Sequence, residues 1–342
     1  MKSNYQNLMD IVKNEKTVSG RDIFDVVSML SSNEDEEFFE TDYFNTNKKR
    51  QREVAKLFTI DSIKIEANAN DYHNIAVEYA RSNLLDCALV VLDKGIIENP
   101  NNIDLLADII LYGVEGGRRN KSKLAYNQIK KAGKARWNWR VYSFTLEYLI
   151  DIANTLPEGK RLDEVREEAF KLADDYIFWA KQNPRYLDRA YYDKSKVVKT
   201  FGGDLSEEKV LLEGLKVDPS APLCSLQLID VFENHNKFDE VLKYLNNCQM
   251  AVNKPQPDVD PAYVYLRLGM TKASKLISET KDVEYGEKDN DVKSIYKDFH
   301  TVLKLQSALT SYKQSAKSII KILEVQTGIE DTYESKERTE FI

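Results

Sequence analysis

Apolar side chains recur in several segments of the chain at steps of three and four residues, the spacing of an amphipathic helix. In the C-terminal part, this spacing predicts one long helix over residues 291–323. Asp260 and Pro261 predict the start of another helix, which runs to about Ile277, because proline fits the first helical turn. Residues 327–342 are charged and are predicted to form a flexible tail.

The first 68 residues are predicted to form a separate helical segment. They hold an amphipathic stretch at residues 23–30, an acidic run at 33–40 (NEDEEFFE) and a basic run at 48–52 (KKRQR). Such runs are typical of solvated helix faces or connectors and, less often, of docking motifs. We expect a helix over residues 47–57. Residues 58–65 (FTIDSIKI) alternate like a short strand, but a helix is favoured because no nearby segment could pair with them.

A repeated pattern begins at residue 69. Its first copy places bulky and small residues at fixed spacings: Tyr72, Ile75, Ala76, Tyr79, Ala88, Leu92, Gly95 and Pro100. Bulky side chains wedge between helices, whereas alanine lets the two helices of a hairpin approach closely. Proline cannot continue a helix and therefore closes the unit. The pattern predicts a helical hairpin.

Further copies follow along the chain. One copy consists of Tyr191, Ser195, Val198, Leu211, Gly214 and Pro219. The separation of Pro100 and Pro219 leaves room for two more units, at residues 103–136 and 137–187. The second of these carries an insertion around residues 154–166. A fifth unit covers residues 223–255, with Phe232 at the position of the signature tyrosine.

These motifs resemble the tetratricopeptide repeat (TPR) family, whose signature is W-x2-L-G-x2-Y, A-x3-F and P over about 34 residues. The resemblance covers residues 69–255 and implies an all-α protein, a right-handed superhelical array of about five helical hairpins (a TPR-like α-solenoid). Residues 1–68 would precede it as a helical segment, and residues 256–326 would form a helical cap over its last apolar face.

Composition narrows the class of protein. Of 342 residues, 42% are hydrophobic and 31% charged, while only 13 are glycine and 8 proline, which favours helices over a turn-rich β-sandwich. No apolar segment is long enough to span a membrane, and the first residues lack the apolar run of a secretory signal. The three cysteines are far apart, so we expect no disulfide framework and a reducing, cytoplasmic location. The net charge of −7 argues against wholesale nucleic-acid binding.

No catalytic motif is present. His73, His235 and His300 are widely separated, and the chain has no HExxH, Cys-x2-Cys, G-x-S-x-G or phosphate-binding loop. The glycine doublets at 116–117 and 202–203 are interpreted as turns. Cys87 is interpreted as a small core residue. We therefore expect a protein that is not an enzyme and has no cofactor or metal.

The TPR resemblance implies that the first helix of each hairpin lines a concave groove. The candidate partner-binding residues on these helices are His73, Asn74, Arg81, Arg140, Phe144, Arg189, Tyr192, Lys196 and Lys199, and Glu147 is also expected to face the groove. Together they would form a partly basic, aromatic trough suited to an acidic peptide or a terminal carboxylate. The alternative interpretation is that they are ordinary solvated residues.

A basic run occupies residues 118–140. It holds nine cations and no acidic residue: Arg118, Arg119, Lys121, Lys123, Lys130, Lys131, Lys134, Arg136 and Arg140. With Trp137 and Trp139 at its end, this run could track a phosphate backbone. Alternatively, it packs against acidic residues of this chain, such as residues 33–40, or of a partner. The two tryptophans point in different directions on a helix, so at least one is expected in the core.

The sequence therefore favours a non-enzymatic, cytoplasmic scaffold or adaptor that binds a protein or peptide. A nucleic-acid-associated protein using the basic run is the first alternative. A peptide-sensing regulator, with the first 70 residues as its output module, is the second.

Overall fold

The computed structural model describes residues 4–32, 41–202, 206–219, 221–233, 237–252, 259–279, 288–305 and 308–332. Helices make up almost all of its regular structure, so the expected all-α class is confirmed. The chain divides into two compact units, Met1–Tyr176 and Ile177–Ile342, with the boundary inside helix α9 (Lys160–Gln182). None of the described helices is long and apolar enough to cross a membrane.

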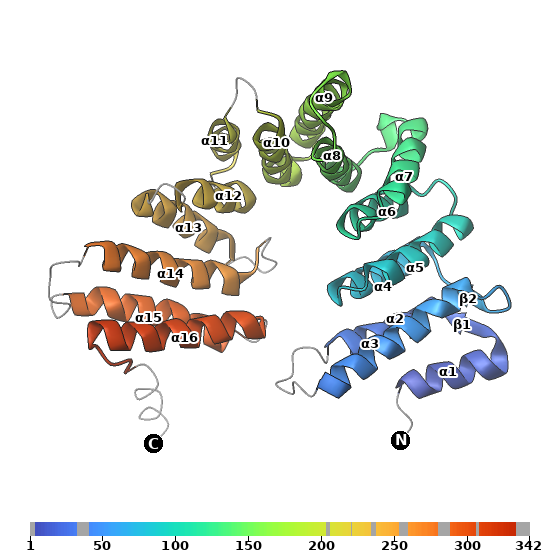
Figure 1. The fold of residues 1–342 in the computed structure, drawn as a ribbon, viewed down its shortest axis with the longest axis horizontal. Helices are drawn as coiled ribbons and strands as arrows, with labels where there is room; N and C mark the ends of the chain where they lie inside the picture. Colours follow the sequence, from blue (N-terminus) through green and yellow to red (C-terminus); the bar gives the residue numbers. More distant parts are fainter. Residues whose placement is uncertain are drawn as a thin grey trace. The chain divides into compact units, whose positions relative to one another are not determined.

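The first unit begins with three α-helices, a short 3-10 helix and a pair of short strands (Figure 1). They follow the order α1 (Asn4–Glu15), β1 (Thr17–Ser19), α2 (Gly20–Ser32), α3 (Thr41–Lys56), η1 (Leu57–Thr59) and β2 (Lys64–Glu66). Strands β1 and β2 pair in parallel, with Val18 opposite Ile65, and both of these side chains are buried. The prediction of a helix over residues 58–65 is wrong, because the pairing partner lies much earlier in the chain rather than nearby.

Helical hairpins follow in sequence order. The first is α4 (Ala69–Arg81) with α5 (Leu85–Glu98), and the second is α6 (Ile103–Glu115) with α7 (Arg119–Ala132). After η2 (Lys134–Arg136), α8 (Trp139–Ala153) leads into α9, and the expected insertion appears as the loop before a helix of 23 residues. Helix α6 packs against both α4 and α8, so the first helices of successive hairpins are neighbours. This arrangement is compatible with a helical repeat.

Asparagine side chains set the start of these first helices. Asn68, Asn102 and Asn138 are the N-caps of α4, α6 and α8, and each accepts hydrogen bonds from two backbone N–H groups of the first turn. The cap satisfies N–H groups that have no partner within the helix. Asn138 Nδ2 also donates to Asp104 Oδ1 at 2.6 Å, which ties the start of α8 to the start of α6.

The second unit continues with helices that pack on their sequence neighbours. After η3 (Pro184–Tyr186) they are α10 (Leu187–Phe201), α11 (Glu207–Val217), α12 (Pro222–Glu233), α13 (Phe238–Val252), α14 (Pro261–Glu279), α15 (Asp289–Lys304) and α16 (Thr310–Thr327). Asp188 accepts hydrogen bonds from the backbone N–H groups of Leu223 and Cys224 at 2.8 and 2.9 Å. This carboxylate therefore ties α10 to α12, as Asp104 ties α6 to α8.

Two glycines show that hairpins in different units share one packing scheme. A Cβ atom on Gly95 would lie 2.9 Å from Tyr72 Cγ and 3.1 Å from Leu105 Cδ1. A Cβ atom on Gly214 would lie 2.9 Å from both Tyr191 Cβ and Cys224 Sγ. The two neighbours stand at the same sequence separations from the glycine in both hairpins. Each glycine therefore allows a signature tyrosine and the following first helix to approach closely.

The C-terminal helices differ from the prediction in one respect. Helix α14 begins at Pro261, as expected. The single helix predicted over residues 291–323 is instead two helices, α15 and α16, because the chain becomes extended at Leu305. Phe299 and Val302 of α15 share one core cluster with Ile320 and Leu323 of α16. The three- and four-residue spacing continues through the break because both helices bury their apolar faces in the same core.

Candidate functional site

A hydrogen-bonded network joins the first helices of three hairpins in the first unit. His73 Nδ1 of α4 lies 2.6 Å from Asp108 Oδ2 of α6, and Arg140 Nη2 of α8 lies 2.9 Å from His73 Nε2. A guanidinium group can only donate, so Nε2 accepts from Arg140 and Nδ1 carries the proton donated to Asp108. The structure thus brings two of the predicted residues, His73 and Arg140, into direct contact, and it adds a carboxylate, Asp108, that the sequence did not single out.

The network is buried on one side and open on the other. Asp108 is 1% exposed, whereas the His73 side chain is 20% exposed. Burial raises the pKa of Asp108, and the hydrogen bond from His73 and the charge of Arg140 act against that increase. Arg140 is half-buried and lies 5.7 Å from the centre of the Trp139 ring. Its guanidinium is therefore held in place while keeping N–H groups for another acceptor.

The other predicted residues of this unit lie at different depths. Asn74 is exposed on α4, and the Arg81 side chain is 70% exposed while donating to Glu78 at 2.7 Å. Phe144 is only 8% exposed and packs edge-on against Trp139, with ring centres 6.1 Å apart. Phe144 supports the half-buried Trp139, which presents the more accessible aromatic surface.

Carboxylates also belong to this group of helices. Partial burial, followed by the charge of Glu147 on α8, raises the pKa of Glu115 on α6. Burial, together with the charges of Asp108 and Glu115, raises the pKa of Tyr112. The electrostatic character of α4, α6 and α8 is therefore mixed rather than uniformly basic. Asp108 could have been noticed in the sequence as a lone carboxylate inside the apolar segment of residues 105–112.

The predicted residues of the second unit form a cluster of their own on α10. The centre of the Tyr192 ring lies 5.7 Å from Arg189 Cζ and 5.0 Å from Lys196 Nζ. Residues three and four apart share one helix face, so the ring lies between two cations. Arg189 Nε also approaches the buried Asp193 at 3.4 Å. Lys199 Nζ instead lies 3.6 Å from Glu207 Oε1 at the start of α11.

The basic run pairs largely with carboxylates of neighbouring helices. Five of its nine cations form ion pairs with α5, α8 and α9: Arg118 with Asp86, Arg119 with Asp151, Lys121 with Asp93, Lys130 with Glu168, and Lys134 with Asp175. These pairs support the interpretation that the run packs against acidic residues of the same chain. Those residues are not the acidic run at 33–40, which lies outside the described residues.

The tryptophans at the end of the basic run are separated as expected. Trp137 is 6% exposed and packs edge-on against Tyr142, with ring centres 5.2 Å apart. Trp139 is half-buried. The prediction that at least one of the two belongs to the core is confirmed.

The described part of the chain offers little support for a metal site or a cysteine nucleophile. Within it, no group of three or more His, Cys, Asp or Glu residues could hold a metal ion. Burial raises the pKa of Cys87 and Cys224, and it raises the pKa of Cys248 to about 12. These thiols are therefore protonated at neutral pH and are poor nucleophiles. His235 lies outside the described residues.

Comparison of the sequence with protein-family models and with curated proteins finds no match. The likeness to tetratricopeptide repeats therefore rests on the residue spacings of residues 69–255 and on the packing of their helices in sequence order.

Proposed function

We propose that the chain is a non-enzymatic interaction protein, a scaffold or adaptor that binds an extended segment of a partner protein along α4, α6 and α8. The supporting observation is the His73–Asp108–Arg140 network, which joins these three helices and leaves Arg140 partly exposed. A buried carboxylate and a fixed histidine hold the guanidinium in one orientation. A preorganised donor loses less entropy when a ligand binds.

The surrounding residues define the partner's chemistry. Asn74, Arg81 and Arg140 are donors for carboxylates and backbone carbonyls of an acidic segment. Trp139 supplies an aromatic surface, which is common at protein interfaces. Lys196 and Arg189 flank Tyr192 in the second unit and offer the same combination of cation and ring. The residues of the first unit form the proposed binding surface, with Phe144 as an internal support, and the group around Tyr192 in the second unit is kept as a separate candidate.

The nucleic-acid alternative has less support. Carboxylates already accompany five of the nine cations in the basic run, so the run's local charge is much smaller than its sequence indicates. Phosphate binding depends on cations that can replace counterions. The peptide-sensing regulator and the cytoplasmic location remain predictions from the sequence.

A randomised peptide display library tests the proposal. Peptides selected on the whole protein should be rich in Asp and Glu, and fluorescence anisotropy then gives their affinities. Asn74→Glu adds a negative charge on the proposed surface without touching the network, so it should weaken binding about tenfold. Arg140→Glu should weaken it further.

Lys131→Glu on α7 is the control, since it makes a larger charge change than Asn74→Glu at an exposed residue outside the proposed surface. It should leave the affinity within about twofold, which corresponds to less than about 0.5 kcal/mol. Failure to select any peptide, or equal losses in Asn74→Glu and Lys131→Glu, would argue against the proposed surface.

A further inference from the structure

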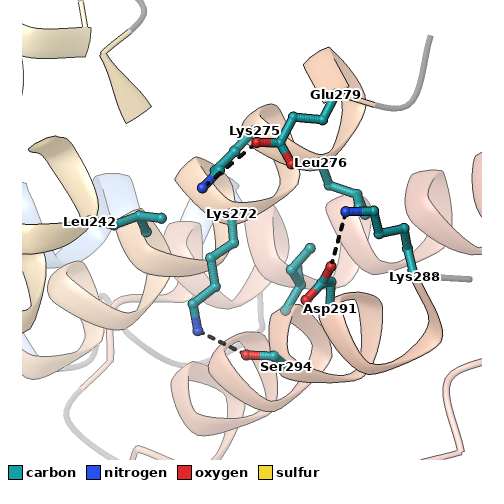
Figure 2. A pocket seen from close by; sticks show the side chains of 9 residues that line it. Leu242, Lys272, Lys275, Leu276, Glu279, Lys288, Asp291 and Ser294 are labelled. Carbon is teal, nitrogen blue, oxygen red and sulfur yellow. Dashed lines mark hydrogen bonds and ion pairs between the residues drawn. The ribbon is translucent and has the colours of Figure 1, made fainter. Parts of the chain in front are cut away.

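A cavity of about 360 Å³ opens in the second unit between α13, α14 and α15 (Figure 2). Its lining combines three lysines and two carboxylates with an apolar wall. The volume falls within the range of about 300–1,000 Å³ that is usual for small-molecule sites. No residue of the peptide surface proposed above contributes to it, so the two sites can be tested separately.

Lys272 is held in place by Asp298, which lies outside the lining, and by Ser294, which belongs to it. Its Nζ donates to Asp298 Oδ2 at 2.6 Å and to Ser294 Oγ at 3.0 Å. Asp298 is only 6% exposed, so the carboxylate side of this contact is shielded from solvent. An ammonium group has three N–H donors. The two contacts therefore fix Lys272 and leave its third donor for an acceptor inside the cavity.

Two further ion pairs at the cavity are too long for good hydrogen bonds. Lys275 Nζ lies 3.7 Å from Glu279 Oε1, and Lys288 Nζ lies 3.8 Å from Asp291 Oδ2 (Figure 2). Donor–acceptor distances in protein N–H···O hydrogen bonds are about 2.7–3.2 Å. The Glu279 and Asp291 carboxylates therefore retain acceptor capacity for a ligand, and Lys288 retains donor capacity.

The charges of the cavity are close to balance. Three ammonium groups and two carboxylates line it, and Asp239 and Asp298 contact Lys275 and Lys272 from outside the lining. The carboxylates would repel a simple anion, and the lysines would repel a simple cation. A molecule that carries both charges can satisfy both kinds of group.

The remaining wall of the cavity is apolar and comes from three different helices. Leu242 of α13, Leu276 of α14 and Ile295 of α15 provide it. A short aliphatic group placed against these side chains would lose contact with water, which favours binding.

We propose that this cavity binds a small zwitterion with an aliphatic side chain, of the class of a free amino acid or a dipeptide. Its carboxylate would contact Lys272 and Lys288, and its ammonium group would contact Glu279 and Asp291. Its side chain would pack on Leu242, Leu276 and Ile295. Each part of the ligand thus has a matching part of the wall.

Isothermal titration calorimetry on the full chain tests this proposal with L-leucine and L-leucyl-L-leucine. We expect at least one of them to bind saturably, with a dissociation constant of about 1 mM or lower. The matched probes are 4-methylpentanoate, which lacks the amine, isoamylamine, which lacks the carboxylate, and glycine, which lacks the side chain. Each should bind at least about tenfold more weakly than the zwitterion that binds.

Two variants locate the binding in the cavity. Asp291→Asn should weaken the zwitterion about tenfold without weakening 4-methylpentanoate, because the amine-free anion gains from the loss of a nearby negative charge. Lys293→Gln, on the same helix but outside the lining, should leave both affinities unchanged. The proposal is overturned if neither zwitterion binds, if the amine-free probe binds equally well, or if Asp291→Asn has no effect. None of these results bears on the peptide surface of the first unit.

Discussion

Valine in place of Gly95 tests the close approach of hairpin helices. Even the first added carbon would lie 2.9 Å from Tyr72 Cγ and 3.1 Å from Leu105 Cδ1. Tyr72 cannot move aside readily, because it is fully buried and its hydroxyl donates to Glu98 Oε2 at 2.5 Å. The substitution therefore forces extra volume into a packed interface.

The expected cost follows from two opposing effects. Overpacking a core costs about 1–3 kcal/mol, and three added carbons place this change at the upper end. Valine has a higher helix propensity than glycine, and this difference stabilises the folded state by only a few tenths of a kcal/mol. The whole range of helix propensity from alanine to glycine is about 1 kcal/mol. We expect Gly95→Val to lower the free energy of unfolding by about 2–3 kcal/mol.

Urea denaturation followed by far-UV circular dichroism measures this change. Asn127→Val, at an exposed position on α7, is the control and should stay within about 0.5 kcal/mol of the wild type. Gly214→Val should cost about as much as Gly95→Val, because its neighbours stand at equivalent positions. If Gly95→Val is as stable as the control, or if only one glycine is sensitive, the shared packing scheme is refuted.

Three further predictions concern electrostatics and thiol chemistry. Burial raises the pKa of Asp108 in the folded state, so the wild type should lose stability relative to Asp108→Asn as the pH rises above about 4. Measuring the free energy of unfolding of both proteins from pH 4 to pH 7 checks this, and a difference between them that does not change with pH would contradict it. Arg119→Gln should lower the free energy of unfolding by less than about 1 kcal/mol, because the ion pair of Arg119 with Asp151 is exposed, and this loss should shrink in 1 M salt. A loss that salt does not change would argue against an ionic contribution. Cys87, which is half-buried, should react with a thiol reagent in the native protein well before the buried Cys224 and Cys248. Equal reaction rates for all three cysteines would contradict this difference in burial.

The sequence predicted the hairpins because their packing depends on local spacing. A tyrosine, a glycine and a proline at fixed separations mark where two helices touch and where the chain turns. Pro100 and Pro219 located the hairpins around them without any knowledge of tertiary contacts. The sequence did not predict the break at Leu305, because the helices on both sides bury their apolar faces in one core. The hydrophobic periodicity therefore continues through the break and gives no sign of it.

The contacts that the sequence did not predict join residues that are far apart in the chain. The pairing of β1 with β2 involves only three residues in each strand, too few to show a clear alternation. The basic run contains no acidic residue, so its sequence cannot show that carboxylates on three other helices accompany it. His73 and Arg140 were predicted to line one groove, but not to contact each other. Only the packing of α6 between α4 and α8 places Asp108 where it joins His73 and, through it, Arg140.

Photocrosslinking tests the proposed binding surface most directly. A benzophenone amino acid replaces Asn74 on α4 in one variant and Lys131 on α7 in another, and each is irradiated with a peptide selected from the library. We predict that the peptide crosslinks to position 74 and not to position 131, and that excess unlabelled peptide abolishes the product. A crosslink at position 131 with none at position 74 would contradict the proposal that α4, α6 and α8 bind the partner.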